Sequence, residues 1–183
     1  MIIMDNQIRQ EYLNKHLPYR INSLLSPDLI EYRRNNSTST DLKIKCFSDS
    51  LILEPSFEIS IIFGRSLLQF LEIGYSNSSN SLIDYRPKPD DYTIRSLYPN
   101  LNLKPINDTI VSTNYQNLCV ISKIANKSVA HLTSKESNPG EHELLKPARM
   151  AIYKLMLEYI PDINKISSTD KTGIWWFEQV ENL

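Results

Sequence analysis

The sequence PSFEISIIFGRSLLQFLEIG, residues 55–74, decides the fold. Its apolar side chains recur at three- and four-residue spacing and cover nearly the whole circumference of a helix. Ser56 is suited to cap the start of this helix, and Gly74 stands where a glycine favours a helix end. We therefore predict a central helix over residues 55–74 that is surrounded by other elements.

The flanking sequence also has helical periodicity, broken by prolines and polar loops. The expected helices cover residues 5–17, 18–25, 90–98, 108–133 and 141–159. Residues 42–53 fit either a helix or, near their end, a strand, and residues 76–81 fit a loop. Pro18 lacks an N–H and should break or kink the first helix, and Pro27 should interrupt the chain again.

These elements together predict an all-α fold, an up-and-down helical bundle with an irregular Pro-rich insertion. We expect one helical domain over residues 1–165. The tail, residues 166–183, carries Trp175, Trp176 and Phe177, which should dock on the domain or on a second copy.

Composition excludes several classes of function. The 20 basic and 21 acidic side chains nearly cancel, so any contact with nucleic acid must be a local patch. Only four glycines are present, and the two cysteines stand far apart, which disfavours a phosphate-binding loop and a zinc site. We therefore expect no metal and no cofactor. Without a long apolar run or a signal peptide, we expect a cytoplasmic protein with no membrane contact.

Residues 124–133 carry the motif with the most chemical content, IANKSVAHLT. It resembles the histidine helix of HEPN (higher eukaryotes and prokaryotes nucleotide-binding) proteins, in which an arginine precedes a histidine on one helix, often as R-N-K-x-x-A-H. Asn126, Lys127, Ala130 and His131 match that string. Ala125 occupies the arginine position, which is the departure from the family pattern.

The resemblance implies a homodimer in which the His131 side chains of two copies approach each other, in a bacterial defence or toxin–antitoxin context. In an active enzyme of this kind, His131 would transfer protons and a cation would hold the phosphate during metal-independent RNA cleavage. Lys123 and Lys127 can supply charge but not the bidentate grip of arginine. The absence of that arginine favours a degenerate ribonuclease or a non-catalytic RNA-binding protein.

Three further side chains are candidates for binding. Arg65 lies in the most apolar helix, where it needs either a ligand or an ion pair with Glu58, Glu72 or another helix. His16 lies on the apolar stripe of the first helix, where we expect a partly buried ring with a neighbouring partner. Arg20, two positions after the expected break at Pro18 and four after His16, is a further candidate of the same kind as Arg65.

A second interpretation needs no RNA. The motif also fits an ordinary amphipathic helix in which Asn126 and His131 only form hydrogen bonds within the bundle. The chain would then be a non-catalytic protein-interaction module with a cognate protein partner. An anionic ligand held by Arg65 and His16 is a third alternative.

Overall fold

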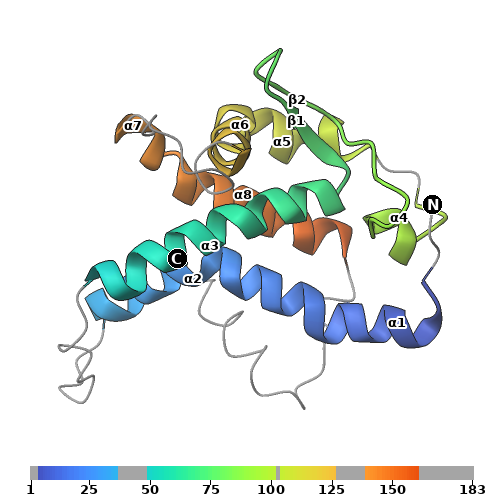
Figure 1. The fold of residues 1–183 in the computed structure, drawn as a ribbon, viewed down its shortest axis with the longest axis horizontal. Coiled ribbons are helices and arrows are strands. Elements are labelled where there is room, and N and C mark those ends of the chain that lie inside the picture. The colour runs from blue at the N-terminus through green and yellow to red at the C-terminus, as the bar shows by residue number, and fades with distance from the viewer. Residues whose placement is uncertain (1–3, 37–48, 102–103, 127–138, 161–183) are drawn as a thin grey trace.

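The computed structural model describes residues 4–36, 49–101, 104–126 and 139–160 (Figure 1). This part of the chain is mostly helical, as expected, but it also carries one small antiparallel sheet and so is not purely all-α. The elements are α1 (Asn6–Glu11), the π-helical turn η1 (Tyr12–His16), α2 (Leu17–Asn36), α3 (Asp49–Phe70), β1 (Ile73–Ser76), β2 (Ser81–Asp84), α4 (Ile94–Leu97), the 3-10 turn η3 (Pro105–Asn107), α5 (Thr109–Thr113), α6 (Tyr115–Ile124), α7 (Pro139–His142) and α8 (Leu145–Tyr159).

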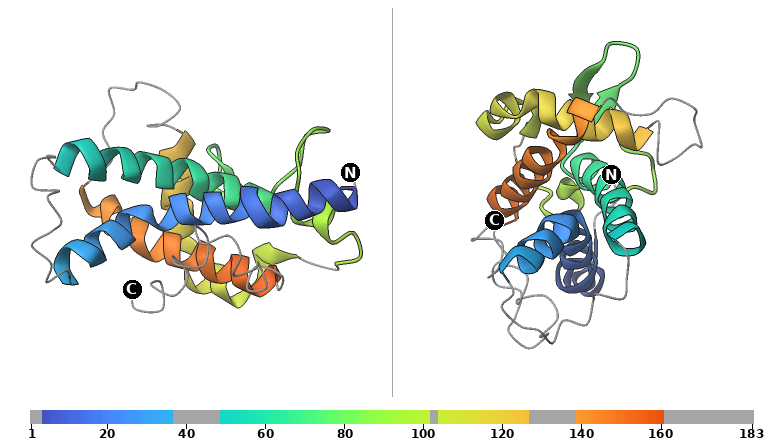
Figure 2. Two further views of the ribbon diagram at one scale, coloured as in Figure 1. Left: turned by 90° about the horizontal axis from the view of Figure 1, so that it is seen from below. Right: turned by 90° about the vertical axis from the view of Figure 1, so that its left-hand side faces the viewer.

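The helices α2 and α3 form an antiparallel pair at the centre of the fold. Tyr12, just before α2, stacks on Phe70 at the end of α3, and Tyr19 meets Phe63 further back along α3. α8 packs against both helices, and α6 crosses α3 and α8 (Figure 2). Buried apolar side chains from all of these helices form one continuous core.

Two prolines that should have interrupted the first helix lie within it. The chain is helical from Asn6 to Asn36, and the π turn before α2 resets the hydrogen-bond register just before Pro18. Pro27 lacks the N–H that would bond the carbonyl of Ser23, and the Ser26 hydroxyl donates to that carbonyl at 2.9 Å instead. The expected boundaries at Pro18 and Pro27 were therefore wrong, because local substitutes satisfy the backbone.

The central helix α3 is displaced from its predicted range. It begins at Asp49, before Pro55, and ends at Phe70, so Ser56 is an internal residue that donates its hydroxyl to the Leu53 carbonyl at 2.7 Å. The left-handed residue after the helix is Glu72 (φ 63°), whereas Gly74 lies in β1. The predicted roles of Ser56 and Gly74 were wrong.

Most of the apolar side chains of α3 lie in the core, as expected, but one face does not. Ile59 and Ile62 are 42% and 47% exposed, so the helix is not surrounded on all sides. On the buried side of α3, Gly64 has no side chain, which lets α6 approach closely. A Cβ at this position would stand 2.5 Å from Cδ1 of Ile121, closer than packed atoms allow.

The loop expected over residues 76–81 is confirmed as the turn of the hairpin β1–β2, whose two strands were not predicted. The register of the hairpin pairs Ile73 with Asp84 and Ser76 with Ser81, and Leu82 of β2 is buried in the core. The strands are four residues each, too short for the alternation of apolar and polar residues to predict them.

The later helices follow the prediction with interruptions. The helix expected over residues 108–133 divides at Asn114 into α5 and α6, and its final part lies outside the described residues. The helix expected over residues 90–98 is the single turn α4. The helix expected over residues 141–159 is α8, preceded by the short α7, and the tail over residues 166–183 lies outside the described residues.

Candidate nucleic-acid interface

The motif that predicts RNA chemistry is only partly described. His131 and Lys127 lie outside the described residues, so the proposed catalytic role of His131 stays a prediction. Asn126 is half-buried and lies in a π-helical turn with Ala125, directly after α6.

The described part of the motif presents no unpaired cation. Ala125, in the position of the family's arginine, is 3% exposed and belongs to the core. Lys123, the one basic residue of α6, forms an ion pair with Glu141 of α7 at 2.5 Å between Nζ and Oε1. The hydrogen bond from Lys123 to Glu141 raises the pKa of the lysine. Its charge is therefore already neutralised by a neighbour.

The candidates on the first helix do come together. Arg20 Nη1 donates to the backbone carbonyl of His16 at 3.0 Å, and the guanidinium lies 5.7 Å from the centre of the Tyr12 ring. The His16 ring lies 5.5 Å from the same tyrosine ring. His16 is exposed, so the expectation of a partly buried histidine was wrong.

Tyr12 connects this cluster to two other elements. Its ring lies 5.8 Å from Phe70 of α3 and 5.7 Å from Tyr92, which precedes α4. Burial raises the pKa of the Tyr12 hydroxyl, and the positive charge of Arg20 partly opposes that shift. The phenol is therefore neutral, and its ring packs between the neighbouring aromatic side chains.

Arg65 pairs with neither Glu58 nor Glu72, the two carboxylates that we named as partners. Among the described residues it forms no ion pair, and Glu72 pairs instead with Arg95 at 3.0 Å. Its positive charge acts on Tyr85, whose hydroxyl donates to Asp91 at 2.7 Å. Arg65 is half-buried.

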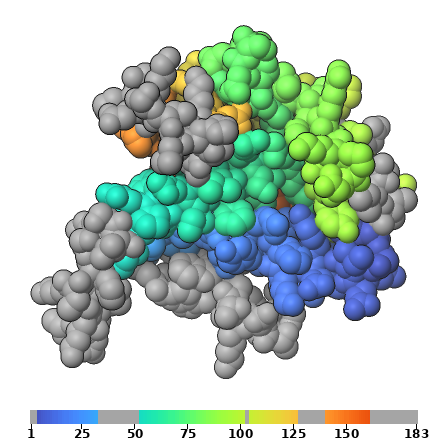
Figure 3. Space-filling view, viewed as in Figure 1, coloured from blue at the N-terminus to red at the C-terminus, as the bar shows by residue number. Residues whose placement is uncertain are grey.

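We name Tyr12, His16, Tyr19, Arg20, Arg65 and Tyr92 the basic–aromatic face. They come from η1, α2, α3 and the segment before α4, which are neighbouring elements in the space-filling view (Figure 3). Ring contacts join Tyr12 to His16, Arg20 and Tyr92. Tyr19 meets Phe63 of α3, and Arg65 lies near Tyr85. Tyr19 is the most exposed large apolar side chain of the described residues, at 62%. The spacing of Tyr12, His16 and Arg20, four residues apart each time, could have predicted this face if Pro18 had not been taken for a helix break.

The residues that sequence reasoning missed form a buried ion pair. Arg149 of α8 donates from Nε and Nη2 to the two carboxylate oxygens of Asp28 in α2, at 2.6 and 2.7 Å, and lies 5.2 Å from the Phe57 ring. Both side chains are almost fully buried. The remaining nitrogen, Nη1, has no hydrogen-bond partner in the described part of the chain. The partners stand 121 positions apart, and neither has a motif around it.

The chain matches no family model, no curated protein and no solved structure. Within the described ranges, no helix has both the length and the hydropathy that a bilayer span requires. The same ranges hold no group of three histidine, cysteine or carboxylate side chains close enough to share a metal ion.

Proposed function

We propose that the protein binds single-stranded RNA through the basic–aromatic face. The observation that carries this proposal is the Arg20 guanidinium over the Tyr12 ring, with an exposed His16 beside it. Arg65, on the adjacent helix α3, has no ion-pair partner among the described residues. Arginines grip phosphate oxygens, and exposed rings stack on unpaired bases regardless of sequence. The nearly neutral chain gives no general attraction, so binding depends on this local group.

We also propose that the protein does not cleave RNA, in keeping with the degenerate motif that resembles HEPN ribonucleases. The buried Ala125 and the Lys123–Glu141 pair support this part of the proposal, because they leave the described motif without a cation for the phosphate. Cleavage by 2′-hydroxyl attack needs that cation as well as a proton-transfer group.

The resemblance to HEPN proteins further implies a helical bundle that assembles as a cytoplasmic homodimer. The exposed Ile59 and Ile62 of α3 support a contact with a second copy, because a paired chain would remove both side chains from water. Sedimentation of wild type beside Ile62→Glu tests this contact. The charged variant should be monomeric, and a wild-type monomer would contradict the dimer.

The binding proposal is tested by fluorescence anisotropy with a labelled single-stranded RNA of about 12 nucleotides. The wild type should bind the single strand more tightly than a duplex of the same sequence. Arg20→Ala/Arg65→Ala should weaken binding by roughly tenfold, from two lost contacts of under ~1 kcal/mol each. Lys146→Ala/Lys154→Ala removes the same charge from the exposed side of α8 and serves as the matched control.

The inactivity proposal has its own experiment. The RNA is incubated with wild type and with His131→Ala, without metal, and its length is followed on a denaturing gel. Both samples should leave the RNA intact. Cleavage by wild type that is lost in His131→Ala would overturn this part of the proposal and leave the binding result unaffected.

A further inference from the structure

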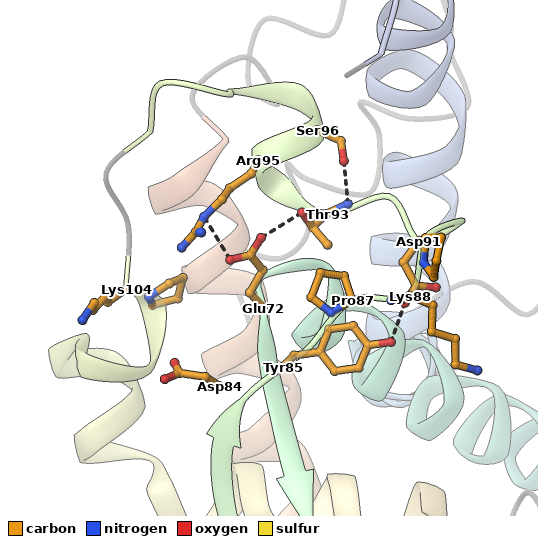
Figure 4. A pocket seen from close by; sticks show the side chains of 12 residues that line it. Glu72, Asp84, Tyr85, Pro87, Lys88, Asp91, Thr93, Arg95, Ser96 and Lys104 are labelled. Carbon is orange, nitrogen blue, oxygen red and sulfur yellow. Dashed lines mark hydrogen bonds and ion pairs between the residues drawn. The ribbon is translucent and has the colours of Figure 1, made fainter. Parts of the chain in front are cut away.

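A pocket of about 540 Å³ opens at the end of the molecule that holds α4 (Figure 4). Its walls come from the end of α3, the end of the hairpin, the Pro-rich segment, α4 and η3. This volume lies in the range of pockets for small organic ligands and is too small for a folded partner. None of the residues predicted from sequence to bind lines it.

The rim of the pocket is fixed by Glu72. This residue has a left-handed backbone (φ 63°), a conformation that is unfavourable for a residue other than glycine. Its carboxylate accepts from the Thr93 hydroxyl at 2.9 Å and pairs with Arg95 Nε at 3.0 Å. The backbone N–H of Thr93 in turn donates to the Ser96 hydroxyl at 3.1 Å. The end of α3 is therefore tied to α4, which pre-forms one side of the pocket.

The opposite side is closed by a second hydrogen-bonded group. The Tyr85 hydroxyl and the Lys88 backbone N–H each donate to Asp91 Oδ2 at 2.7 Å. Burial and the bond to Asp91 raise the pKa of Tyr85 to about 12, so the phenol keeps its proton and its bond. With Pro87, Pro89 and Pro105, the tyrosine gives the pocket rigid apolar surface.

The charged side chains that line the pocket sum to zero, and some of them have no partner within the described chain. Three are basic (Lys88, Arg95 and Lys104) and three are acidic (Glu72, Asp84 and Asp91). Glu72 and Asp91 have the partners described above. Within the described chain, Lys104 and Asp84 form neither an ion pair nor a side-chain hydrogen bond, and both lie on the Arg95 side of the pocket (Figure 4).

We propose that this pocket binds a zwitterionic small molecule, a free α-amino acid with a large apolar side chain. Its carboxylate pairs with Lys104, with Arg95 beside it, and its ammonium group pairs with Asp84. Its side chain lies on Tyr85 and the prolines. A zwitterion adds no net charge to a neutral lining, whereas a phosphate dianion would leave a charge uncompensated. The proposal does not depend on RNA binding.

Titration calorimetry with L-phenylalanine and matched analogues tests the proposal. Phenethylamine lacks the carboxylate, 3-phenylpropanoic acid lacks the ammonium group, and adenosine monophosphate supplies a phosphate with a ring. L-phenylalanine should bind at least tenfold more tightly than each analogue, since a hydrogen bond to a charged group is worth roughly a factor of ten. Equal binding of either single-charge analogue, tighter binding of the nucleotide, or no binding of L-phenylalanine overturns it.

Variants of the charged lining residues test whether the ligand binds in this pocket. Asp84→Asn and Lys104→Met should each lower the affinity for L-phenylalanine at least tenfold, whereas Asp90→Asn and Arg86→Ala, at exposed positions outside the lining, should not. Circular dichroism confirms that each variant is folded. Asp84 is not part of the basic–aromatic face, so Asp84→Asn should not weaken RNA binding. Unaltered affinity of Asp84→Asn and Lys104→Met for L-phenylalanine overturns the assignment to this pocket.

Discussion

Two arginines in apolar helices, Arg149 and Arg65, have opposite surroundings. Arg149 is buried, holds Asp28 through two hydrogen bonds and faces the Phe57 ring. Arg65 is half-buried, and no carboxylate of the described chain pairs with it. Sequence reasoning singled out Arg65 and passed over Arg149. The comparison teaches that an apolar helix does not reveal which of its faces an arginine occupies, and that this face decides whether the guanidinium meets a buried carboxylate.

The first prediction tests the buried ion pair between Arg149 and Asp28. Arg149→Met leaves Asp28 as an unpaired buried carboxylate and should lower the free energy of unfolding by about 3–5 kcal/mol. Urea denaturation measures the loss. Lys146→Met on the exposed side of α8 should change the free energy by less than about 0.5 kcal/mol.

A double variant tests whether the loss of stability comes from the unpaired carboxylate. Asp28→Leu/Arg149→Met replaces both charges with apolar groups and should recover most of the stability lost by the single variant. If Arg149→Met alone were as stable as wild type, the pair would not organise the contact between α2 and α8.

The second prediction concerns the salt dependence of RNA binding and the two arginines of the basic–aromatic face. The logarithm of the RNA association constant should fall linearly with the logarithm of the salt concentration. Arg20→Ala/Arg65→Ala should reduce that slope by about 1.4, which corresponds to two single-strand phosphate contacts. An unchanged slope would mean that neither arginine contacts phosphate.

The third prediction compares the motif with the basic–aromatic face. Lys123 is neutralised by Glu141, so Lys123→Ala should change RNA affinity by less than about twofold and stability by under about 1 kcal/mol. The raised pKa of Lys123 means that its stabilisation is present below its ordinary pKa of 10.5 and is lost as the pH rises through the higher folded value. Thermal melts of wild type and Lys123→Ala should therefore converge at strongly alkaline pH. A large loss of RNA affinity would instead place binding at the motif.

The smallest expected effect concerns Asp91, beside the pocket. The Tyr85 hydroxyl and the Lys88 backbone N–H lower the pKa of this carboxyl. Its contribution to stability is therefore present above its ordinary pKa of 3.8 and is lost as the pH falls through the lower folded value. Asp91→Asn should melt below wild type near neutral pH, and the gap should shrink in acid. A gap that is constant with pH would contradict this role.

The sequence predicted the helical core because α2, α3, α6 and α8 carry apolar residues at helical spacing, and residues such as Leu67, Leu71 and Ile152 are indeed buried. It did not predict the boundaries, because Ser26 and the π turn before Pro18 satisfy backbone groups in ways that no single residue type signals.

The candidate site could likewise be predicted only in part. His16 and Arg20 could be grouped from their spacing along one helix. Tyr92 and Arg65 joined them only through tertiary contacts, which a single sequence does not encode as a local pattern. The pocket at Glu72 depends on five segments and on one left-handed residue, so no motif marks it.

Cross-linking tests the central claim most directly, because it shows where RNA lies on the protein. RNA that carries 4-thiouridine is irradiated with the wild-type protein, and mass spectrometry identifies the modified peptides. The account predicts cross-links within residues 12–20 and 85–92, which contain Tyr12, Tyr19 and Tyr92. Cross-links confined to residues 115–138 would contradict it and return the binding site to the histidine motif.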